Sequence, residues 1–377
     1  MHRWIVIPDS FKGSLSSLDI CCIAQERIHK IFPEDEVYAV PVADGGEGTV
    51  DCFLAALGGE RVRVSVQGPL GQPIDCDYAR VEDLAVVEMA SAAGLPLMGE
   101  KKDPLRASTY GVGQQMRHAM GKGAQRLLLG LGGSATNDGG CGAAAALGVR
   151  FLKQDGSCFI PTGETLKQIA AIDPEPCRQL VRRCPVTAMC DIDNPLCGEF
   201  GAAAVFGPQK GADLKAVRLL DEGLFHLAQV IQQDLGLKVA ELPGAGAAGG
   251  FGAGAYAFFQ AQLKPGIEAI LDIVHFDRML RSADLVLTGE GRIDSQSLRG
   301  KVVAGVAQRA KKQNLPVIAL VGDVGDGVEH VYEMGVSAIF SINRTAVPFS
   351  QARLRSRQDY GDTLEDLLRY TKLFSQS

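Results

Sequence analysis

The sequence lacks any apolar run long enough to cross a bilayer. A membrane-spanning helix needs about 20 consecutive apolar residues. The Ala/Gly stretch at residues 245–257 is long but only weakly hydrophobic, and its glycines suit such a helix poorly. The apolar stretch at residues 4–8 is too short for a signal peptide, and a polar loop follows it at once. We therefore expect a cytoplasmic protein that does not bind membranes.

Metal-binding patterns are absent as well. None of the ten cysteines forms a Cys-x-x-Cys pair, and Cys177, Cys184, Cys190 and Cys197 are spaced six or seven residues apart. This spacing does not suit a zinc ribbon or finger, and the six histidines form no metal pattern. The cysteines therefore favour the ordinary buried thiols of a cytosolic protein.

The sequence has no excess of basic residues and no P-loop. Its net charge is −6, without a basic stripe that could neutralise the phosphates of a nucleic acid. Its Gly-Lys pairs, at 121–122 and 300–301, are not followed by serine or threonine, as a P-loop requires. We expect no nucleic-acid partner, and an anionic substrate would need a local cluster of cations.

Residues 127–140 show the pattern of an anion site. The apolar run Leu127–Leu131 predicts a buried strand, and the Ala-rich run Cys141–Leu147 predicts a helix. Backbone N–H groups and the helix dipole at such a helix start bind anions, and glycine lets a phosphate approach closely. The intervening loop supplies glycine, hydroxyl and amide groups from Gly132, Gly133, Ser134, Thr136 and Asn137. It therefore predicts a phosphate site.

The same order of apolar run and polar loop recurs along the chain. The runs are residues 5–8, 37–42, 85–87, 186–189, 285–288 and 317–321. Short apolar runs that alternate with helical segments predict an α/β fold with mostly parallel sheets. Ligands of such sheets bind beyond the carboxyl ends of the strands, so we expect the site among these loops.

The length of 377 residues predicts two domains. Residues 1–66 and 280–377 share a pattern of longer βα units, whereas the middle is richer in glycine and turn signals. We predict a discontinuous Rossmann-like parallel-sheet domain from residues 1–66 and 280–377, with a second α/β domain, residues 67–279, inserted into it.

Two glycine patterns allow more than one interpretation. Gly130-x-Gly132-x-x-Ala135 matches the dinucleotide fingerprint and keeps a nicotinamide-dependent dehydrogenase open, although residues 136–140 interrupt the place where its helix should run. The uncharged run 243–254 contains Gly246, Gly249 and Gly250. It could be a backbone cradle for nucleotide phosphates or a tightly packed small-residue helix, and we weigh the two equally.

Charged residues in the strand-end loops are the candidates for chemistry. Lys12 and Arg292 lie in glycine-containing loops and suit a carboxylate or a phosphate. Phosphoryl transfer also needs carboxylates, to take the proton of the attacking hydroxyl and to hold a metal ion. Six carboxylates are candidates for these roles, although some will be helix caps: Asp44, Glu47, Asp191, Asp193, Glu290 and Asp294.

A string of motifs over almost the whole chain resembles the bacterial type I glycerate kinases. The motifs are Asp9-Ser-Phe-Lys-Gly-Ser-Leu-Ser16, Ala43-Asp-Gly-Gly-Glu-Gly-Thr49, Thr109-Tyr-Gly111, Gly132-Gly-Ser-Ala-Thr-Asn-Asp-Gly-Gly140, Asp193-Asn-Pro-Leu-Cys-Gly198, Phe206-Gly-Pro-Gln-Lys-Gly211, Gly244-Ala-Gly-Ala-Ala-Gly-Gly250 and Leu287-Thr-Gly-Glu-Gly-Arg-Ile-Asp294. The resemblance implies the two-domain α/β fold and ATP- and Mg²⁺-dependent phosphorylation of D-glycerate to 2-phosphoglycerate.

The roles of individual residues come from the chemistry above rather than from the resemblance. We expect the 132–137 loop and the 244–252 run to cradle ATP, and Ser10, Lys12 and Arg292 to hold glycerate or the transferring phosphate. Asp191 or Asp294 would take the hydroxyl proton, and Asp193 and Glu290 would hold Mg²⁺. A non-catalytic nucleotide-binding regulator is a further alternative, and the sequence leaves open whether the chain forms a homodimer.

Overall fold

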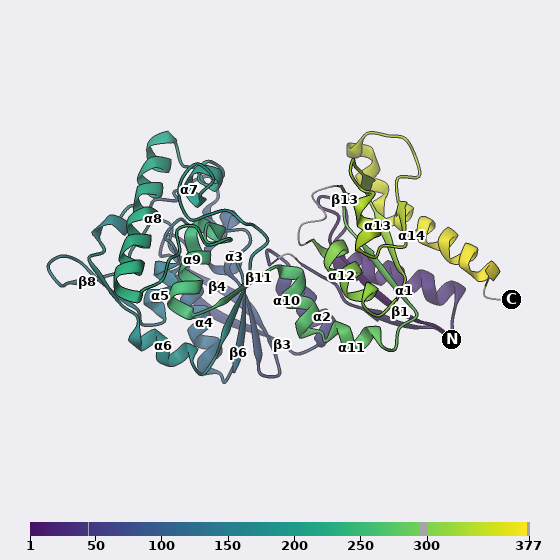
Figure 1. The fold of residues 1–377 in the computed structure, drawn as a ribbon, viewed down its shortest axis with the longest axis horizontal. Coiled ribbons are helices and arrows are strands. Elements are labelled where there is room, and N and C mark those ends of the chain that lie inside the picture. Colours follow the sequence, from purple (N-terminus) through teal and green to yellow (C-terminus); the bar gives the residue numbers. More distant parts are fainter. Residues whose placement is uncertain (44, 295–300, 375–377) are drawn as a thin grey trace. The chain divides into compact units, whose positions relative to one another are not determined.

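The computed structural model describes residues 1–43, 45–294 and 301–374, which divide into two compact units. Unit 1 comprises Met1–Ala43, Ala55–Leu57 and Ile267–Ser377, and unit 2 comprises Asp44–Leu54 and Gly58–Gly266. Both units alternate strands and helices (Figure 1). The expected α/β class with parallel sheets is confirmed.

Unit 1 is built on a five-stranded sheet in the order β2-β1-β12-β14-β16, in which every neighbouring pair is parallel. The strands are β1 (Arg3–Pro8), β2 (Glu36–Ala39), β12 (Leu285–Gly289), β14 (Val317–Val321) and β16 (Ala338–Ser341). A small parallel pair, β13 (Arg292–Ile293) and β15 (Asp323–Val324), follows β12 and β14. The helices are α1 (Ser17–Ile31), α10 (Gly266–Ile273), α11 (Phe276–Leu280), α12 (Val302–Lys311), α13 (His330–Met334) and α14 (Phe349–Phe374).

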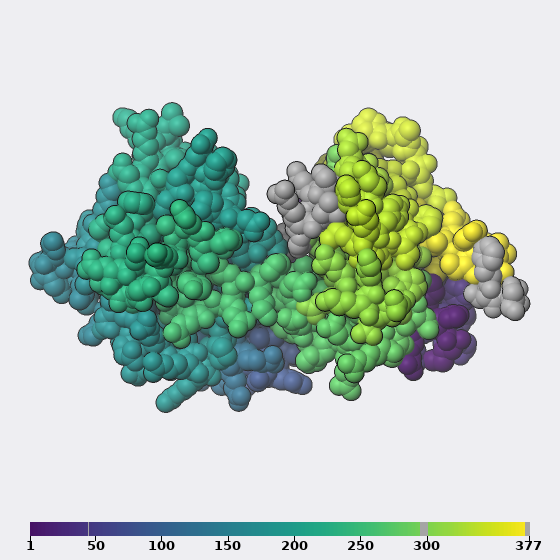
Figure 2. Space-filling view, viewed as in Figure 1, coloured from purple at the N-terminus to yellow at the C-terminus, as the bar shows by residue number. Residues whose placement is uncertain are grey.

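Both faces of the unit 1 sheet are covered, which is why its strands are apolar throughout. Alternate side chains of β1, Trp4 and Val6, join a buried cluster with α1 and α14. Within α14, Tyr360 and Leu364 are buried in this cluster, whereas Leu354 on the same helix is 79% exposed (α14 is yellow in Figure 2). α12 contacts β12 and β14.

Unit 2 contains a six-stranded mixed sheet in the order β11-β10-β6-β5-β4-β3. Its strands are β3 (Glu60–Gln67), β4 (Pro73–Val81), β5 (Leu84–Glu88), β6 (Arg126–Gly130), β10 (Val186–Met189) and β11 (Gln262–Lys264). The pairs from β5 to β11 are parallel, whereas β3, β4 and β5 pair antiparallel. A second sheet has the order β8-β7-β9, from Cys158–Phe159, Arg150–Leu152 and Ala171–Asp173.

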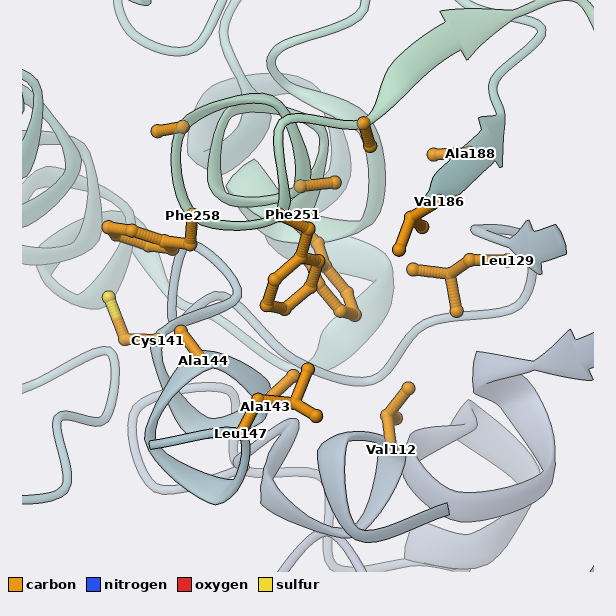
Figure 3. Close-up of a cluster of buried hydrophobic side chains, with 14 of the residues drawn as sticks. Val112, Leu129, Cys141, Ala143, Ala144, Leu147, Val186, Ala188, Phe251 and Phe258 are labelled. Atoms are coloured by element: carbon orange, nitrogen blue, oxygen red, sulfur yellow. The ribbon is translucent and has the colours of Figure 1, made fainter. Parts of the chain in front are cut away.

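The helices of unit 2 pack on its sheets and on one another. They are α3 (Met89–Ala93), α4 (Tyr110–Gly121), α5 (Cys141–Ala146), α6 (Glu175–Val181), α7 (Ala202–Phe206), α8 (Leu214–Leu235) and α9 (Ala247–Phe259). Figure 3 shows Phe251 of α9 between Val186 of β10 and Ala143 of α5. Helix α2 (Thr49–Leu57) has residues in both units.

The unit boundaries differ from those expected from the sequence. Residues 60–66, expected in the first domain, form most of β3 and pair with β4 in unit 2. Residues 267–279, expected in the inserted domain, carry α10 and most of α11 and belong to unit 1. The boundaries depend on which residues contact one another in the folded chain, and turn patterns in the sequence do not contain that information. Among the described residues, no helix is both long and apolar enough to cross a membrane.

Candidate active site

A pocket of about 520 Å³ in unit 2 lies where the parallel strands β6 and β10 end. The carboxyl ends of parallel strands are where α/β folds bind ligands, and the volume is that of an ordinary small-molecule site. The lining includes Gly132, Gly133 and Ser134 after β6, Cys190, Asp191 and Ile192 after β10, Ala247 and Ala248 of α9, and Glu47, Gln209 and Lys210. The structure thus brings the predicted phosphate loop and Asp191 to one pocket.

The loop between β6 and α5 is held in place by Asp138. This carboxylate is fully buried. Its Oδ2 accepts hydrogen bonds from the Thr109 backbone N–H and hydroxyl, both at 2.8 Å, and from the Gly142 N–H. Burial raises the pKa of Asp138, and these hydrogen bonds oppose the shift. Asp138 therefore fixes the loop against α4 and α5.

The predicted loop residues differ in their access to the pocket. Ser134 lines the pocket, and its Oγ lies 3.0 Å from Thr136 Oγ1 and accepts from the Thr136 N–H. Thr136 and Asn137 are fully buried and are not among the lining residues. Both amide atoms of Asn137 lack a hydrogen-bond partner among the described residues. A buried amide without partners is costly, and a ligand would reach it only after a shift of the loop.

Lys210, which sequence reasoning did not single out, also lines this pocket. It ends the single turn Pro208–Lys210, and its Nζ donates to the Thr136 carbonyl at 2.7 Å and to Ser134 Oγ at 3.3 Å. Only 3% of the residue is exposed. Burial lowers the pKa of Lys210 to about 7, although the charge of Asp138 opposes the shift. The only sequence signal was its place in the Phe206–Gly211 motif.

The second glycine run packs directly against the predicted phosphate loop. Gly249 and Gly250 have φ of +70° and +88° at the start of α9. A Cβ on Gly249 would lie 2.0 Å from the Thr136 carbonyl oxygen, so the close approach requires glycine there. Gly249 and Gly250 thus have a packing role, while the neighbouring Ala247 and Ala248 line the pocket. Gly246, too, has no room for a Cβ, which would lie 2.4 Å from the Pro195 carbonyl.

The two aspartates after β10 are not equivalent. Asp191 lines the pocket, and its Oδ1 accepts from the Gly266 N–H at 2.7 Å, at the first residue of α10. Asp191 therefore does not cap a turn that follows it in the sequence, and instead accepts from the first residue of a helix far along the chain. Asp193 is exposed but does not line the pocket.

Unit 1 has its own pocket, of about 600 Å³, at the ends of the neighbouring parallel strands β1 and β12. It brings together four residues that the sequence singled out, Ser10, Lys12, Glu290 and Arg292. The charged lining residues are Asp9, Lys12, Glu290, Arg292, Lys301, Asp323 and Arg353. Cations therefore outnumber carboxylates locally, although the whole chain is acidic.

The charges in the unit 1 pocket are partly paired. Arg292 lies 3.3 Å from Asp294 Oδ2 and 3.5 Å from Asp323 Oδ2. Glu290 is 4% exposed, and its Oε2 lies 3.7 Å from Lys301 Nζ. Asp294, a candidate base, thus lies beside the predicted anion-binding arginine.

The described residues contain no group of three or more His, Cys, Asp or Glu side chains that could hold a metal ion. Mg²⁺ in phosphoryl-transfer sites usually takes one or two protein carboxylates and completes its shell with water and substrate phosphates. Glu47 and Asp191 in the unit 2 pocket, and Glu290 in the unit 1 pocket, fit this description. Asp44 lies outside the described residues.

The dinucleotide fingerprint does not have its structural context here. In that motif the helix begins at the glycines, whereas ten residues, 131–140, separate β6 from α5. Asp155, at the spacing expected of the ribose-binding acid, is instead engaged with Ser157 in an exposed turn. This geometry argues against a nicotinamide-dependent dehydrogenase.

Comparison with known proteins agrees with the sequence resemblance. The model of the glycerate kinase family matches residues 4–372. The chain is 46% identical over 345 residues to the glycerate kinase of Halalkalibacterium halodurans, covering 91% of each chain. It is 42% identical over 341 residues to the glycerate 2-kinase of Escherichia coli, covering 90% of each. A solved structure of a putative glycerate kinase 2 from Salmonella typhimurium LT2 matches with a TM-score of 0.88 and 39% identity, covering both chains fully.

Proposed function

The chain belongs to the glycerate kinase family, and from this we propose that it transfers the γ-phosphoryl group of ATP to D-glycerate in the cytoplasm. The product that we propose is 2-phosphoglycerate, which follows from the name of the Escherichia coli relative, a glycerate 2-kinase. The observation that carries the proposal is the unit 2 pocket, where the β6–α5 loop presents glycine and a serine hydroxyl, and where the buried Lys210 reaches that loop from the Pro208–Lys210 turn.

We propose the unit 2 pocket as the nucleotide site. Gly132 and Gly133 line this pocket, where the backbone N–H group of Gly133 could bind a phosphate oxygen, and Ser134 adds a hydroxyl donor. Gly249 and Gly250 support this cradle from behind because they let α9 approach the 136–139 backbone, and Gly246 lets the start of α9 approach the backbone of residues 194–195. Thr136 and Asn137 are the buried part of the same loop.

We propose the unit 1 pocket as the glycerate site. Lys12 and Arg292 supply positive charge for the carboxylate or for the transferring phosphate, and Ser10 supplies a hydroxyl group. Both substrates would meet in a cleft between the units, since phosphoryl transfer must exclude water. Small-angle scattering with and without an ATP analogue plus glycerate tests this, and an unchanged radius of gyration would count against closure.

A carboxylate must take the hydroxyl proton as the oxygen attacks phosphorus. Asp191, exposed in the nucleotide pocket, and Asp294, beside Arg292, are the two candidates. Mg²⁺, when bound, would neutralise charge on the phosphates. We propose Asp193 and Glu290 as its protein ligands, with Glu47, which lines the unit 2 pocket, as the alternative to Asp193. Asp193 lies outside the pocket lining, and Glu290 forms an ion pair with Lys301. Mutation of each residue would test whether it is a Mg²⁺ ligand.

An ADP-release assay with D-glycerate tests the activity. We expect ADP at several turnovers per second, as roughly typical of enzymes, and a product that enolase converts to phosphoenolpyruvate without added phosphoglycerate mutase. A product that needs the mutase would be 3-phosphoglycerate and would correct the position. NADH formation from NAD⁺ would favour the dehydrogenase alternative, and ATP binding without turnover would favour a regulator.

A further inference from the structure

Lys210 is the buried cation of the unit 2 pocket. Its side chain reaches the pocket wall from the Pro208–Lys210 turn, and 3% of the residue is exposed. The ammonium has two neutral acceptors, Thr136 O and Ser134 Oγ. Among the described residues, no carboxylate lies within 4 Å of its Nζ to form an ion pair. Burying a cation in this way is unfavourable unless an anion binds beside it.

The other titratable groups around Lys210 do not supply that anion. Asp138, on the same loop as Ser134, acts on Lys210 through its charge alone, because hydrogen bonds tie its oxygens to Thr109 and to α5. The remaining titratable groups of the lining are Glu47, Cys190 and Asp191, and Asp191 is engaged with the start of α10. On the outer side, the exposed Lys102 donates to the Gln209 carbonyl.

We propose that the Lys210 ammonium contacts the phosphates of the bound nucleotide directly and that these phosphates are its counterion. The contact with Ser134 Oγ places Nζ at the loop that we assign to phosphate, and lysine is a common point-charge ligand of phosphate. This inference rests on the proposed function, because it takes the nucleotide as the occupant of this pocket.

Nucleotide binding should then be linked to protonation of Lys210. In the free protein, burial holds the pKa of this amine at about 7, so a large share of the molecules carry neutral Lys210 at neutral pH. Bound phosphates favour the charged form and raise the pKa. Affinity therefore falls by up to about tenfold per pH unit above pH 7, until the pH reaches the pKa of the complex.

Calorimetry of MgADP binding from pH 6 to 9 tests the inference in the wild type, Lys210→Arg, Lys210→Met and Lys102→Met. Wild type should lose at least about tenfold in affinity between pH 7 and 9, and titrations in buffers of different ionisation enthalpy should show uptake of close to one proton at pH 8. Lys210→Arg stays charged over this range, so its affinity should vary less. Lys210→Met should bind weakly at every pH, and Lys102→Met should match the wild type.

The outcomes separate this inference from the proposed function. Equal pH dependence in the wild type and both Lys210 variants would overturn the role of Lys210 while leaving the nucleotide site in place. Absence of MgADP binding to the wild type would overturn the nucleotide site and the inference together. Because proton uptake is measured on the wild type, the inference stays testable if a Lys210 variant fails to fold.

Discussion

Replacement of Asn137 by leucine should stabilise the free protein and weaken nucleotide binding. Asn137 is fully buried, and neither amide atom has a hydrogen-bond partner among the described residues. Each unsatisfied buried group costs about 1–3 kcal/mol, whereas an apolar side chain of the same shape carries no such cost. Leucine branches at the same carbon as asparagine, so we expect Asn137→Leu to raise the free energy of unfolding by about 1–3 kcal/mol.

The same substitution should be unfavourable once the nucleotide is bound. If the amide serves the phosphate site, its loss removes a hydrogen bond to a charged group, which is worth about 1.5–3 kcal/mol. The dissociation constant for ATP should therefore rise about 10-fold to 150-fold. Stability and binding thus change in opposite directions, as expected of a side chain that serves a ligand rather than the fold.

Thr109→Val provides the matched control. Thr109 is also fully buried, but its hydroxyl donates to Asp138 at 2.8 Å and accepts from the Ala143 N–H at 2.9 Å. Valine removes one of the hydrogen bonds to Asp138 and the acceptor of the Ala143 N–H, so this variant should lose about 1–3 kcal/mol of stability. Urea unfolding of the ligand-free proteins measures the first effect, and calorimetric titration with ATP measures the second. A destabilised Asn137→Leu with unchanged ATP affinity would refute the reasoning.

Three further changes test other parts of the site. Asp191→Asn should lower kcat by about 10²–10⁴-fold with little change in ATP affinity, since asparagine can still cap α10, and near wild-type kcat would move the base to Asp294. Gly133→Val should raise the KM for ATP in the folded fraction, but its φ of +73° and the Ala90 Cβ 3.0 Å from the new Cβ also predict lower stability; an unchanged KM would place the cradle elsewhere. Burial raises the pKa of Glu88 from 4.5 to about 6. Between these pH values the folded protein binds more protons than the unfolded protein, so its stability falls as the pH rises from 4.5 to about 6. Glu88→Gln should remove this loss of about 2 kcal/mol from the pH profile of urea unfolding, and an unchanged profile would contradict the assignment to Glu88.

Buried parallel strands were the part of the fold that local sequence could predict. β10 and β14 occupy the predicted residues 186–189 and 317–321, because a strand covered on both faces is a continuous apolar run. β3 and β4 were not predicted, because β3 is half exposed and alternates valine with charged or polar residues. The apolar-run criterion does not detect such a strand, although a search for period-two alternation would.

Which candidate residues lie together could be predicted where they follow two strands that are neighbours in a sheet. β1 and β12 pair in parallel with Pro8 opposite Gly289, so Ser10 and Lys12 come beside Glu290 and Arg292. The pairing of β10 with β6 does the same for Asp191 and the 132–134 loop. Lys210 lies on a turn that does not directly follow any strand in the sequence. Its burial depends on how that turn packs, which composition and spacing do not report.

The two pockets that we propose as anion sites differ in how their cations are paired. Arg292 already has carboxylate neighbours in Asp294 and Asp323, so an incoming glycerate carboxylate would exchange one ion pair for another and gain little net free energy. Lys210 has only neutral acceptors among the described residues, so a phosphate there relieves a buried charge. The balance of charge therefore favours strong, pH-dependent binding at the nucleotide site that we propose in unit 2, and weaker, salt-dependent binding at the glycerate site that we propose in unit 1.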